Sequence, residues 1–196
     1  MSEAADARRA NLLGAAATGL SDAMAGSMAA AGGLDEAASA ALVALLDFTP
    51  HGSVRALSRV VGLTHSGAVR LVDRLVDGAY VERRPGADAR SLTLTLTAAG
   101  RELAERIRAV RGHALADAVA SLSAGQRAVL GEICEQLVGD LTRRRLAQRE
   151  RGEDPAGGAL CRYCDFAACG RPQGLCPAQL AAAALRRQRP DGDPSA

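Results

Sequence analysis

The sequence contains no tryptophan, only two tyrosines and only two phenylalanines among its 196 residues. Without large rings, a hydrophobic core has to be filled by alanine, leucine and valine, and such small side chains favour close-packed helices over a β-sandwich. The length allows one domain, or two small ones, with a substantial core. We therefore expect a mainly α-helical protein.

Lysine is also absent, so all 24 basic residues are arginines, and with 22 acidic residues they give a formal net charge of +2. This balance indicates no particular class of partner for the whole chain. Arginine does present a planar fork of donors that suits phosphates and guanine edges. A nucleic-acid site therefore requires a local surplus of arginine.

Long apolar runs are missing too. The N-terminus carries acidic residues and has no apolar core before Gly14, unlike a secretory signal. No stretch reaches the ~18–20 consecutive apolar residues that cross a bilayer. We expect a soluble, cytoplasmic protein. In a reducing cytosol, clustered cysteines are more typical of metal ligands or redox thiols than of structural disulfides.

What is present is helical periodicity along most of the chain. Apolar residues at helical spacing predict helices at 11–31, 35–48, 53–61, 66–77, 98–122 and 123–150. Ser53, Thr64 and Thr97 are good N-cap types ahead of three of these helices. Two of the helices are short and are joined by a tight turn, which is typical of a helix-turn-helix.

The periodicity changes between residues 80 and 97. Leu92, Leu94 and Leu96 alternate strictly with threonines, and a Pro-Gly turn separates them from the strand-like sequence YVERR. These features predict a two-stranded hairpin with an arginine-rich arm. A helix-turn-helix followed by such a hairpin and by long helices forms a winged helix-turn-helix.

The local arginine surplus falls on this part of the chain. Residues 51–97 carry seven arginines and four acidic residues, which gives 7 − 4 = +3. The second short helix can lie in a major groove, and the hairpin tip can reach a minor groove, whose negative potential attracts arginine. The alternative is a charged face that is only solvated. For the whole constellation we prefer DNA binding.

Five short segments in this region follow a common pattern. They read LTHS at 63–66, RLVDRL at 70–75, VERR at 81–84, DAR at 88–90 and LTAAG at 96–100. In this order they resemble the recognition helix, wing and following helix of the MarR family of bacterial winged-helix regulators. The close match covers about forty residues, and the looser helical layout fits the family from about residue 11 to 150.

The resemblance implies a homodimer in which the helices at 11–31 and 98–150 pair with those of a second copy. Two recognition helices and two wings would then read a pseudo-palindrome. It implies that Arg70 and Ser66 lie against the major groove, that Arg90 enters the minor groove, and that Asp88 orients the wing arginines. The predicted DNA-binding residues are Thr64, His65, Ser66, Arg70, Arg74, Arg83, Arg84, Asp88 and Arg90.

Two residues depart from the family pattern. Gly67 and Val69 stand where the family often has hydroxyl side chains. Fewer hydroxyls leave fewer contacts to bases and phosphates, and a helical glycine costs roughly 1 kcal/mol relative to alanine. We therefore expect DNA affinity to depend on arginine and on the wing. Family members often bind aromatic effectors, and a small-molecule effector is a further expected partner, but the sequence indicates no pocket for one.

The chain divides into five expected parts. A flexible N-terminus at 1–10 precedes the MarR-like domain at 11–150, whose DNA-binding part covers about 35–97. A linker at 151–160 leads to a cysteine-rich appendage at 161–188, and a disordered tail follows at 189–196. The basic run at 143–151 is interpreted as a helix C-terminus rather than as a second DNA site.

Four of the five cysteines lie in the appendage, at Cys161, Cys164, Cys169 and Cys176, with the spacing Cys-x2-Cys-x4-Cys-x6-Cys. Four thiolates provide a closed tetrahedral set of soft ligands. Few apolar residues accompany them, so metal binding would supply folding free energy that the segment lacks. The spacing therefore predicts a metal site.

The metal is left open between two choices. Zinc is slightly favoured because the Cys-x2-Cys pair is similar in form to a zinc knuckle. An iron–sulfur cluster also takes four cysteines, and Cys176-Pro177 resembles the end of bacterial ferredoxin motifs. A third interpretation is a thiol redox switch. The fifth cysteine, Cys134, lies on an apolar helix face and is predicted to be buried in the core.

Together these features predict a DNA-binding transcriptional regulator. The leading interpretation is a homodimeric repressor whose DNA binding is modulated by the metal or redox state of the cysteines. The alternative is an iron–sulfur or electron-carrier protein that uses the winged helix as a dimer scaffold. An enzyme is not expected, because the sequence contains no recognisable catalytic set and zinc closed by four cysteines has no open position for a substrate.

Overall fold

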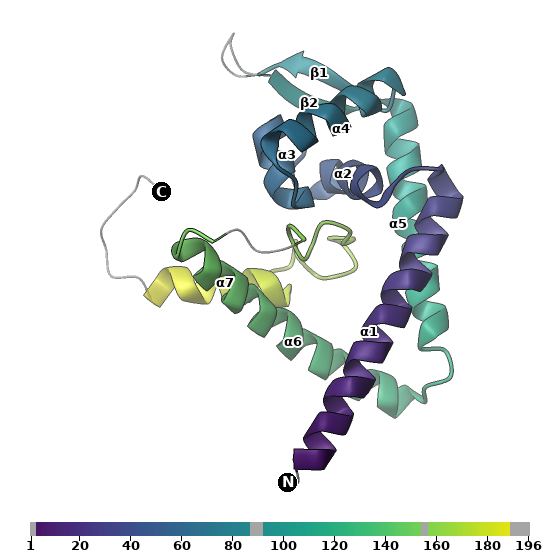
Figure 1. The fold of residues 1–196 in the computed structure, drawn as a ribbon, viewed down its shortest axis with the longest axis vertical. Helices are drawn as coiled ribbons and strands as arrows, with labels where there is room; N and C mark the ends of the chain where they lie inside the picture. Colours follow the sequence, from purple (N-terminus) through teal and green to yellow (C-terminus); the bar gives the residue numbers. More distant parts are fainter. Residues whose placement is uncertain (1–2, 87–91, 154–156, 189–196) are drawn as a thin grey trace.

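The computed structural model of the protein describes residues 3–86, 92–153 and 157–188. The fold is mainly α with a two-stranded antiparallel wing, and the predicted winged helix-turn-helix is confirmed (Figure 1). In chain order the elements are α1 (Glu3–Gly32), α2 (Glu36–Asp47), α3 (Val54–Val61), α4 (His65–Asp77), β1 (Val81–Pro85), β2 (Leu92–Leu96), α5 (Ala98–Ala118), α6 (Ala124–Glu150) and α7 (Pro177–Gln188).

The hydrophobic core lies in what we call the globular lobe (residues 34–107), which comprises α2, α3, α4, the wing and the first half of α5. Eight consecutive residues of α2, from Ala38 to Leu45, are buried, so this helix runs through the middle of the lobe. Leucines supply most of the large buried side chains around it: Leu42, Leu57, Leu71, Leu75 and Leu94. The core is therefore filled as the composition predicts, without aromatic residues at its centre.

The boundaries of the helices follow from their N-caps. The side chains of Asp35, Ser53, Thr64, Thr97 and Ser123 each accept a hydrogen bond from the backbone N–H three residues further on. Each of these bonds satisfies an amide that has no partner inside its helix. The N-caps predicted at three of these positions are confirmed.

The wing is a regular hairpin. Val81 pairs with Leu96, and Arg83 pairs with Leu94. Val81, Leu94 and Leu96 point into the core, whereas Arg83 and Arg84 are exposed. The alternation of the leucines therefore fixes which face of the hairpin is buried. Arg84 lies on the opposite face, whereas Arg83 lies on the same face as its partner Leu94 but is exposed.

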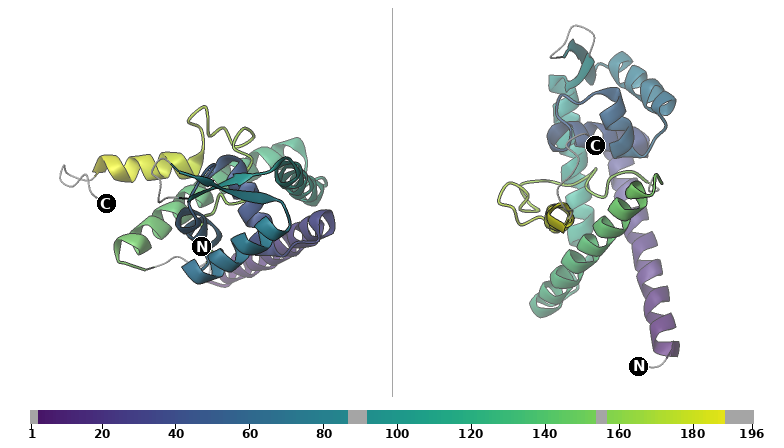
Figure 2. Two further views of the ribbon diagram at one scale, coloured as in Figure 1. Left: turned by 90° about the horizontal axis from the view of Figure 1, so that it is seen from above. Right: turned by 90° about the vertical axis from the view of Figure 1, so that its left-hand side faces the viewer.

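The remaining long helices extend beyond the globular lobe. α1 and α5 run side by side, and α6 crosses back beneath the lobe (Figure 1). In the side view, the N-terminal ends of α1 and α6 point away from the lobe and from each other (Figure 2). Several large apolar side chains on these helices are exposed in the single chain: Leu12, Leu13, Val129, Ile133, Leu137 and Leu141.

Three predictions about these helices need correction. Residues 3–10, where the sequence predicts a flexible terminus, form the start of α1, because Glu3 and Asp6 in the first turn interact favourably with the helix dipole and alanine favours helix. α5 ends at Ala118 rather than near residue 122, because turns form ahead of the N-cap Ser123. Cys134 is exposed in the single chain and is not a core residue.

The cysteine segment (residues 157–176) consists of successive turns and leads into α7, which packs against α6. Among the described residues, no single helix has both the length and the apolar character of a membrane span. Only α1 and α2 taken together, across a bend of 81°, have them by length and composition.

Candidate nucleic-acid interface and cysteine cluster

The second helix of the helix-turn-helix, α4, has one buried and one exposed face. Ala68, Leu71, Val72 and Leu75 pack into the core and hold the helix on the lobe. The predicted DNA-binding residues of this helix and its cap are all exposed: Thr64, His65, Ser66, Arg70 and Arg74. The core residues therefore leave a polar, arginine-bearing face outward, as a groove-reading helix requires.

Three of the predicted arginines form ion pairs on the surface of the lobe. Arg74 pairs with Asp35 at 2.8 Å, Arg84 pairs with Glu82 at 2.6 Å, and Arg83 pairs with Asp73. The pKa of Asp35 lies below its usual value. Burial raises this pKa, but the hydrogen bond from the amide of Ala38 and the pairing with Arg74 lower it further. Exposed pairs of this kind are weak, so a DNA phosphate can compete for these arginines.

The other predicted DNA-binding residues lie on α4, at its N-cap, or at the predicted tip of the wing. Among the described residues, no ion pair is formed by Arg70, whose guanidinium is exposed on α4. The hydroxyls of Thr64 and Ser66 lie 3.3 Å apart at the start of the helix. Asp88 and Arg90, predicted at the tip of the wing, lie outside the described residues. The contacts of all these residues with DNA stay predictions.

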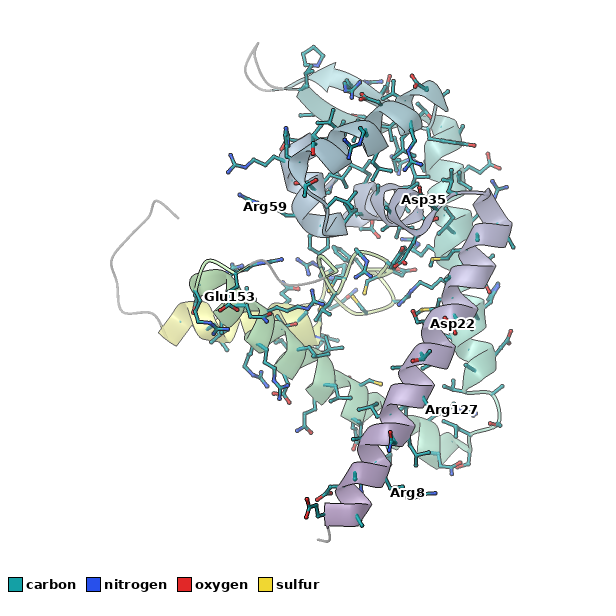
Figure 3. The ribbon with its side chains drawn as sticks, in the orientation of Figure 1. Arg8, Asp22, Asp35, Arg59, Arg127 and Glu153 are labelled. Carbon is teal, nitrogen blue, oxygen red and sulfur yellow. The ribbon has the colours of Figure 1, made fainter. Side chains whose placement is uncertain are left out.

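Sequence reasoning missed two arginines on the first helix of the motif. Arg55 and Arg59 are exposed on α3 and line a cavity of about 790 Å³ together with Thr64 and His65. Their spacing of four residues on a helix whose other face is buried is the signal that could have identified them. They add exposed arginines on α3 to those on α4, and Figure 3 shows the position of Arg59.

The same cavity is bordered by the chain that leaves α6. Glu153 and Gly157 line it together with Thr64 and His65, so the residue range after α6 and the start of the cysteine segment both come near the N-terminus of α4. Figure 3 shows Arg59 and Glu153 on the same side of the molecule. The cysteine segment and the predicted DNA-binding helix are therefore close neighbours.

The cysteines form two adjacent pairs. Cys161 lies near Cys164 and Cys169 lies near Cys176, and the two pairs are close enough to influence each other's pKa values. Within the described ranges, however, no three His, Cys, Asp or Glu side chains are arranged to hold a metal ion. The predicted four-cysteine metal site therefore stays a prediction, and ligation would require the four side chains to turn toward one point.

Positive charge surrounds the thiols. The hydrogen bond with Cys161 and then the charges of Arg111 and Arg171 lower the pKa of Cys164 to about 7, although burial raises it. The hydrogen bond with Cys164 and burial raise the pKa of Cys161, and burial raises that of Cys169. The Nε of Arg111 is buried without a hydrogen-bond partner among the described residues. The arrangement therefore favours the thiolate form at Cys164 and the neutral thiol at Cys161 and Cys169.

The cysteine segment is attached to α3 by backbone contact. The amide of Ala159 donates to the carbonyl of Val60 at 2.8 Å. Gly62 and Gly158 face each other so closely that a Cβ on Gly158 would lie 2.3 Å from the Val60 oxygen. Both glycines have positive φ, at 74° and 71°. Side chains are thus excluded at this contact by both space and backbone conformation.

Two aromatic residues attach the segment to α2. The hydroxyl of Tyr163 donates to the carbonyl of Glu36 at 2.7 Å, and the ring is buried in the lobe. Phe166 meets Phe48 edge to face with 5.9 Å between ring centroids, and the Arg171 guanidinium lies 4.5 Å from the Phe166 centroid. The segment therefore contacts both ends of α2 and the end of α3.

The helix-turn-helix, the wing and the exposed arginines together define a winged-helix DNA-binding protein. The sequence profile described as MarR family matches residues 32–91. A search of curated proteins gives no match. Among solved structures, the MarR family protein Rv2887 of Mycobacterium tuberculosis in complex with salicylic acid is 30% identical, with a TM-score of 0.52, over 64% of this chain and 93% of that chain.

The same mycobacterial protein in complex with DNA is 28% identical, with a TM-score of 0.55, over 65% of this chain and 95% of that one. A MarR family protein from Bacillus stearothermophilus, at 24% identity, shares the fold with a TM-score of 0.64 over 72% of this chain and 99% of that one. The chain belongs to the MarR family of DNA-binding transcriptional regulators, which are not enzymes.

Proposed function

We propose that the protein is a homodimeric repressor that reads a pseudo-palindromic operator with α4 and the wing, and whose DNA affinity depends on a metal held by four cysteines. The observation that carries the DNA part is the exposed arginine face of α4, which the buried leucines of the same helix orient outward. The dimer is supported by the apolar side chains that α1 and α6 expose in the single chain.

The DNA part is tested by replacing Arg70 and Arg90 together with alanine. Loss of two phosphate or base contacts is expected to weaken operator binding by about tenfold or more and to flatten its salt dependence. The control is Arg106→Ala with Arg187→Ala, which removes the same charge from α5 and α7. Fluorescence anisotropy on genomic fragments measures both. Equal retention of DNA by the two double variants, even in low salt, would contradict the proposal.

A small-molecule effector is a further proposed partner. The mycobacterial relative has been crystallised with salicylic acid, which supports a search for an aromatic acid that alters operator binding. The test is operator anisotropy with and without such acids. Unchanged DNA affinity across the series would remove this part of the proposal and leave the DNA part standing.

The metal part is supported by the gathering of four thiols beside Arg111 and Arg171, because positive charge stabilises metal-bound thiolates. Cys161, Cys164, Cys169 and Cys176 would hold the metal, with zinc slightly favoured over an iron–sulfur cluster. Bound there, the metal would supply a cross-link between the two cysteine pairs, and no substrate chemistry. A thiol redox switch is the competing use of the same residues.

The coupling to DNA is supported by where the segment docks. It contacts the first turn of α2 through Tyr163, and the end of α3 through Ala159. Its first residue, Gly157, lines the same cavity as Thr64 and His65 at the start of α4. A metal that fixes this segment would therefore fix the turn between α3 and α4, and its loss would loosen the reading helix.

Metal analysis with an ultraviolet–visible spectrum, on protein purified without oxygen, distinguishes zinc from an iron–sulfur cluster, because only the latter absorbs visible light. Operator affinity of metal-loaded and metal-free protein is then compared, and we expect the metal-free form to bind more weakly. Cys161→Ser with Cys164→Ser should mimic metal loss, whereas Cys134→Ser, which changes the exposed cysteine of α6, should not. Protein that binds no metal would overturn the metal part, and equal affinities would make the metal purely structural.

A further inference from the structure

A cavity of about 340 Å³ lies between α6, α7 and the start of the cysteine segment. Its volume is within the range of small-molecule sites. The described lining contains no acidic residue. It combines apolar side chains, among them Phe48, Leu146, Leu160 and Ala182, with four arginines, Arg145, Arg149, Arg171 and Arg186.

Arg145 is one of the two partly buried arginines of this group. Its guanidinium donates to the carbonyl of Gly158, a neutral partner, at a partly buried position. Burial, and then the positive charges of Arg162 and Arg149, lower the pKa of Arg145. A partly buried cation that faces other cations is destabilised unless an anion joins it. The cavity is therefore electrostatically incomplete.

The cysteines do not account for all of this charge. Arg171 is directed at them, because it lies over the Phe166 ring and acts on the thiols of Cys161 and Cys164. Arg145 and Arg149 come from α6 and Arg186 from α7, on the other walls of the cavity. These three arginines therefore line the cavity from helices α6 and α7, whereas the thiol that lines it belongs to the cysteine segment.

We propose that this cavity binds a small organic anion with two or more negative charges on an apolar body, such as a dicarboxylate or a phosphate monoester. The arginines would bind the charged groups in the fork geometry that suits carboxylate and phosphate. The apolar residues would cover the body of the ligand. This inference does not depend on DNA binding, because it rests only on the charge and the lining of the cavity itself.

The test uses four probes that share a benzene ring and differ in charge: isophthalate, phenyl phosphate, benzoate and benzyl alcohol. Isothermal titration of the purified full chain, at one fixed ionic strength, gives each Kd. We expect the two dianions to bind about tenfold or more tightly than benzoate, and benzyl alcohol not to bind. The first two probes distinguish a carboxylate site from a phosphate site. Dianions that bind no more tightly than benzoate would overturn the proposal.

Paired variants locate the binding. Arg145→Gln with Arg186→Gln should weaken dianion binding by about tenfold or more, whereas Arg144→Gln with Arg187→Gln should leave it unchanged. The control changes the neighbouring residues on the same two helices, which do not line the cavity. Should the first pair fail to fold by circular dichroism, Arg149→Gln alone carries the same expectation with a smaller loss. Equal losses in test and control variants would show that only net charge matters.

Discussion

The globular lobe and the cysteine segment lie against each other but are held in place by different forces. The lobe is closed by leucines such as Leu42 and Leu57, which are completely buried. In the segment, Leu175 is 68% exposed. The contacts of the segment with the lobe include the buried ring and the hydroxyl of Tyr163, one ring pair, one ion pair and one backbone hydrogen bond. Extensive burial makes the lobe cooperative, whereas only a few contacts hold the segment on it. The segment can therefore change state while the lobe stays folded.

The largest expected effect is a difference in stability between a substitution in the lobe and the same substitution in the cysteine segment. Leu42→Ala removes a completely buried side chain from α2 and should lower the free energy of unfolding by about 2–5 kcal/mol. Leu175→Ala makes the same chemical change in the exposed part of the segment and should alter it by less than about 0.5 kcal/mol. Urea unfolding followed by circular dichroism measures both. Similar losses for the two variants would mean that the segment also closes by apolar burial.

The lobe is also the part that could be predicted from the sequence, and the reason is local. Ser53 and Thr64 mark the starts of the two short helices, and the alternation of Leu92, Leu94 and Leu96 marks the wing. Each of these signals acts over a few residues, so a single sequence contains it. The exposed positions of Arg70 and of Ser66 on α4 follow from the same periodicity.

The docking of the cysteine segment could not be predicted in this way. Tyr163 binds the carbonyl of Glu36, and Ala159 binds that of Val60, across about a hundred residues or more of chain. Nothing in the local sequence of either partner indicates such a contact. The prediction that Cys134 is buried in the core is wrong for a related reason. An apolar helix face predicts burial, but it does not indicate whether the chain itself or a second copy covers that face.

A smaller effect should come from the glycine contact that joins the two regions. Gly158→Ala would place a Cβ 2.3 Å from the Val60 oxygen at a residue with φ of 71°. The segment is expected to move away from α3 at a cost of about 1–3 kcal/mol. Hydrogen exchange at the amide of Ala159, which this contact protects, should become much faster, while exchange in α2 should not change.

Gly157 provides the matched control. It has a similar φ of 75°, but a Cβ there meets no atom within 4 Å. Gly157→Ala therefore introduces the same backbone strain without the clash. Exchange at Ala159 that rises equally in both variants would attribute the effect to strain alone, and the close packing of the segment on α3 would then have no energetic role.

The smallest effect concerns Tyr163, whose hydroxyl binds the first turn of α2. Tyr163→Phe should cost about 1 kcal/mol near neutral pH, because one partly buried hydrogen bond is lost. Burial and then the charge of Glu36 raise the Tyr163 pKa from 10.0 to about 12. The folded state thus binds this proton more tightly than the unfolded state does. The contribution of the hydroxyl is fully present below pH 10 and is lost as the pH rises from 10 toward 12.

The free energies of unfolding of wild type and Tyr163→Phe, measured across this pH range, should therefore converge, whereas that of Tyr80→Phe should follow wild type. A gap between wild type and Tyr163→Phe that stays constant up to pH 12 would mean that this hydroxyl is not buried against α2.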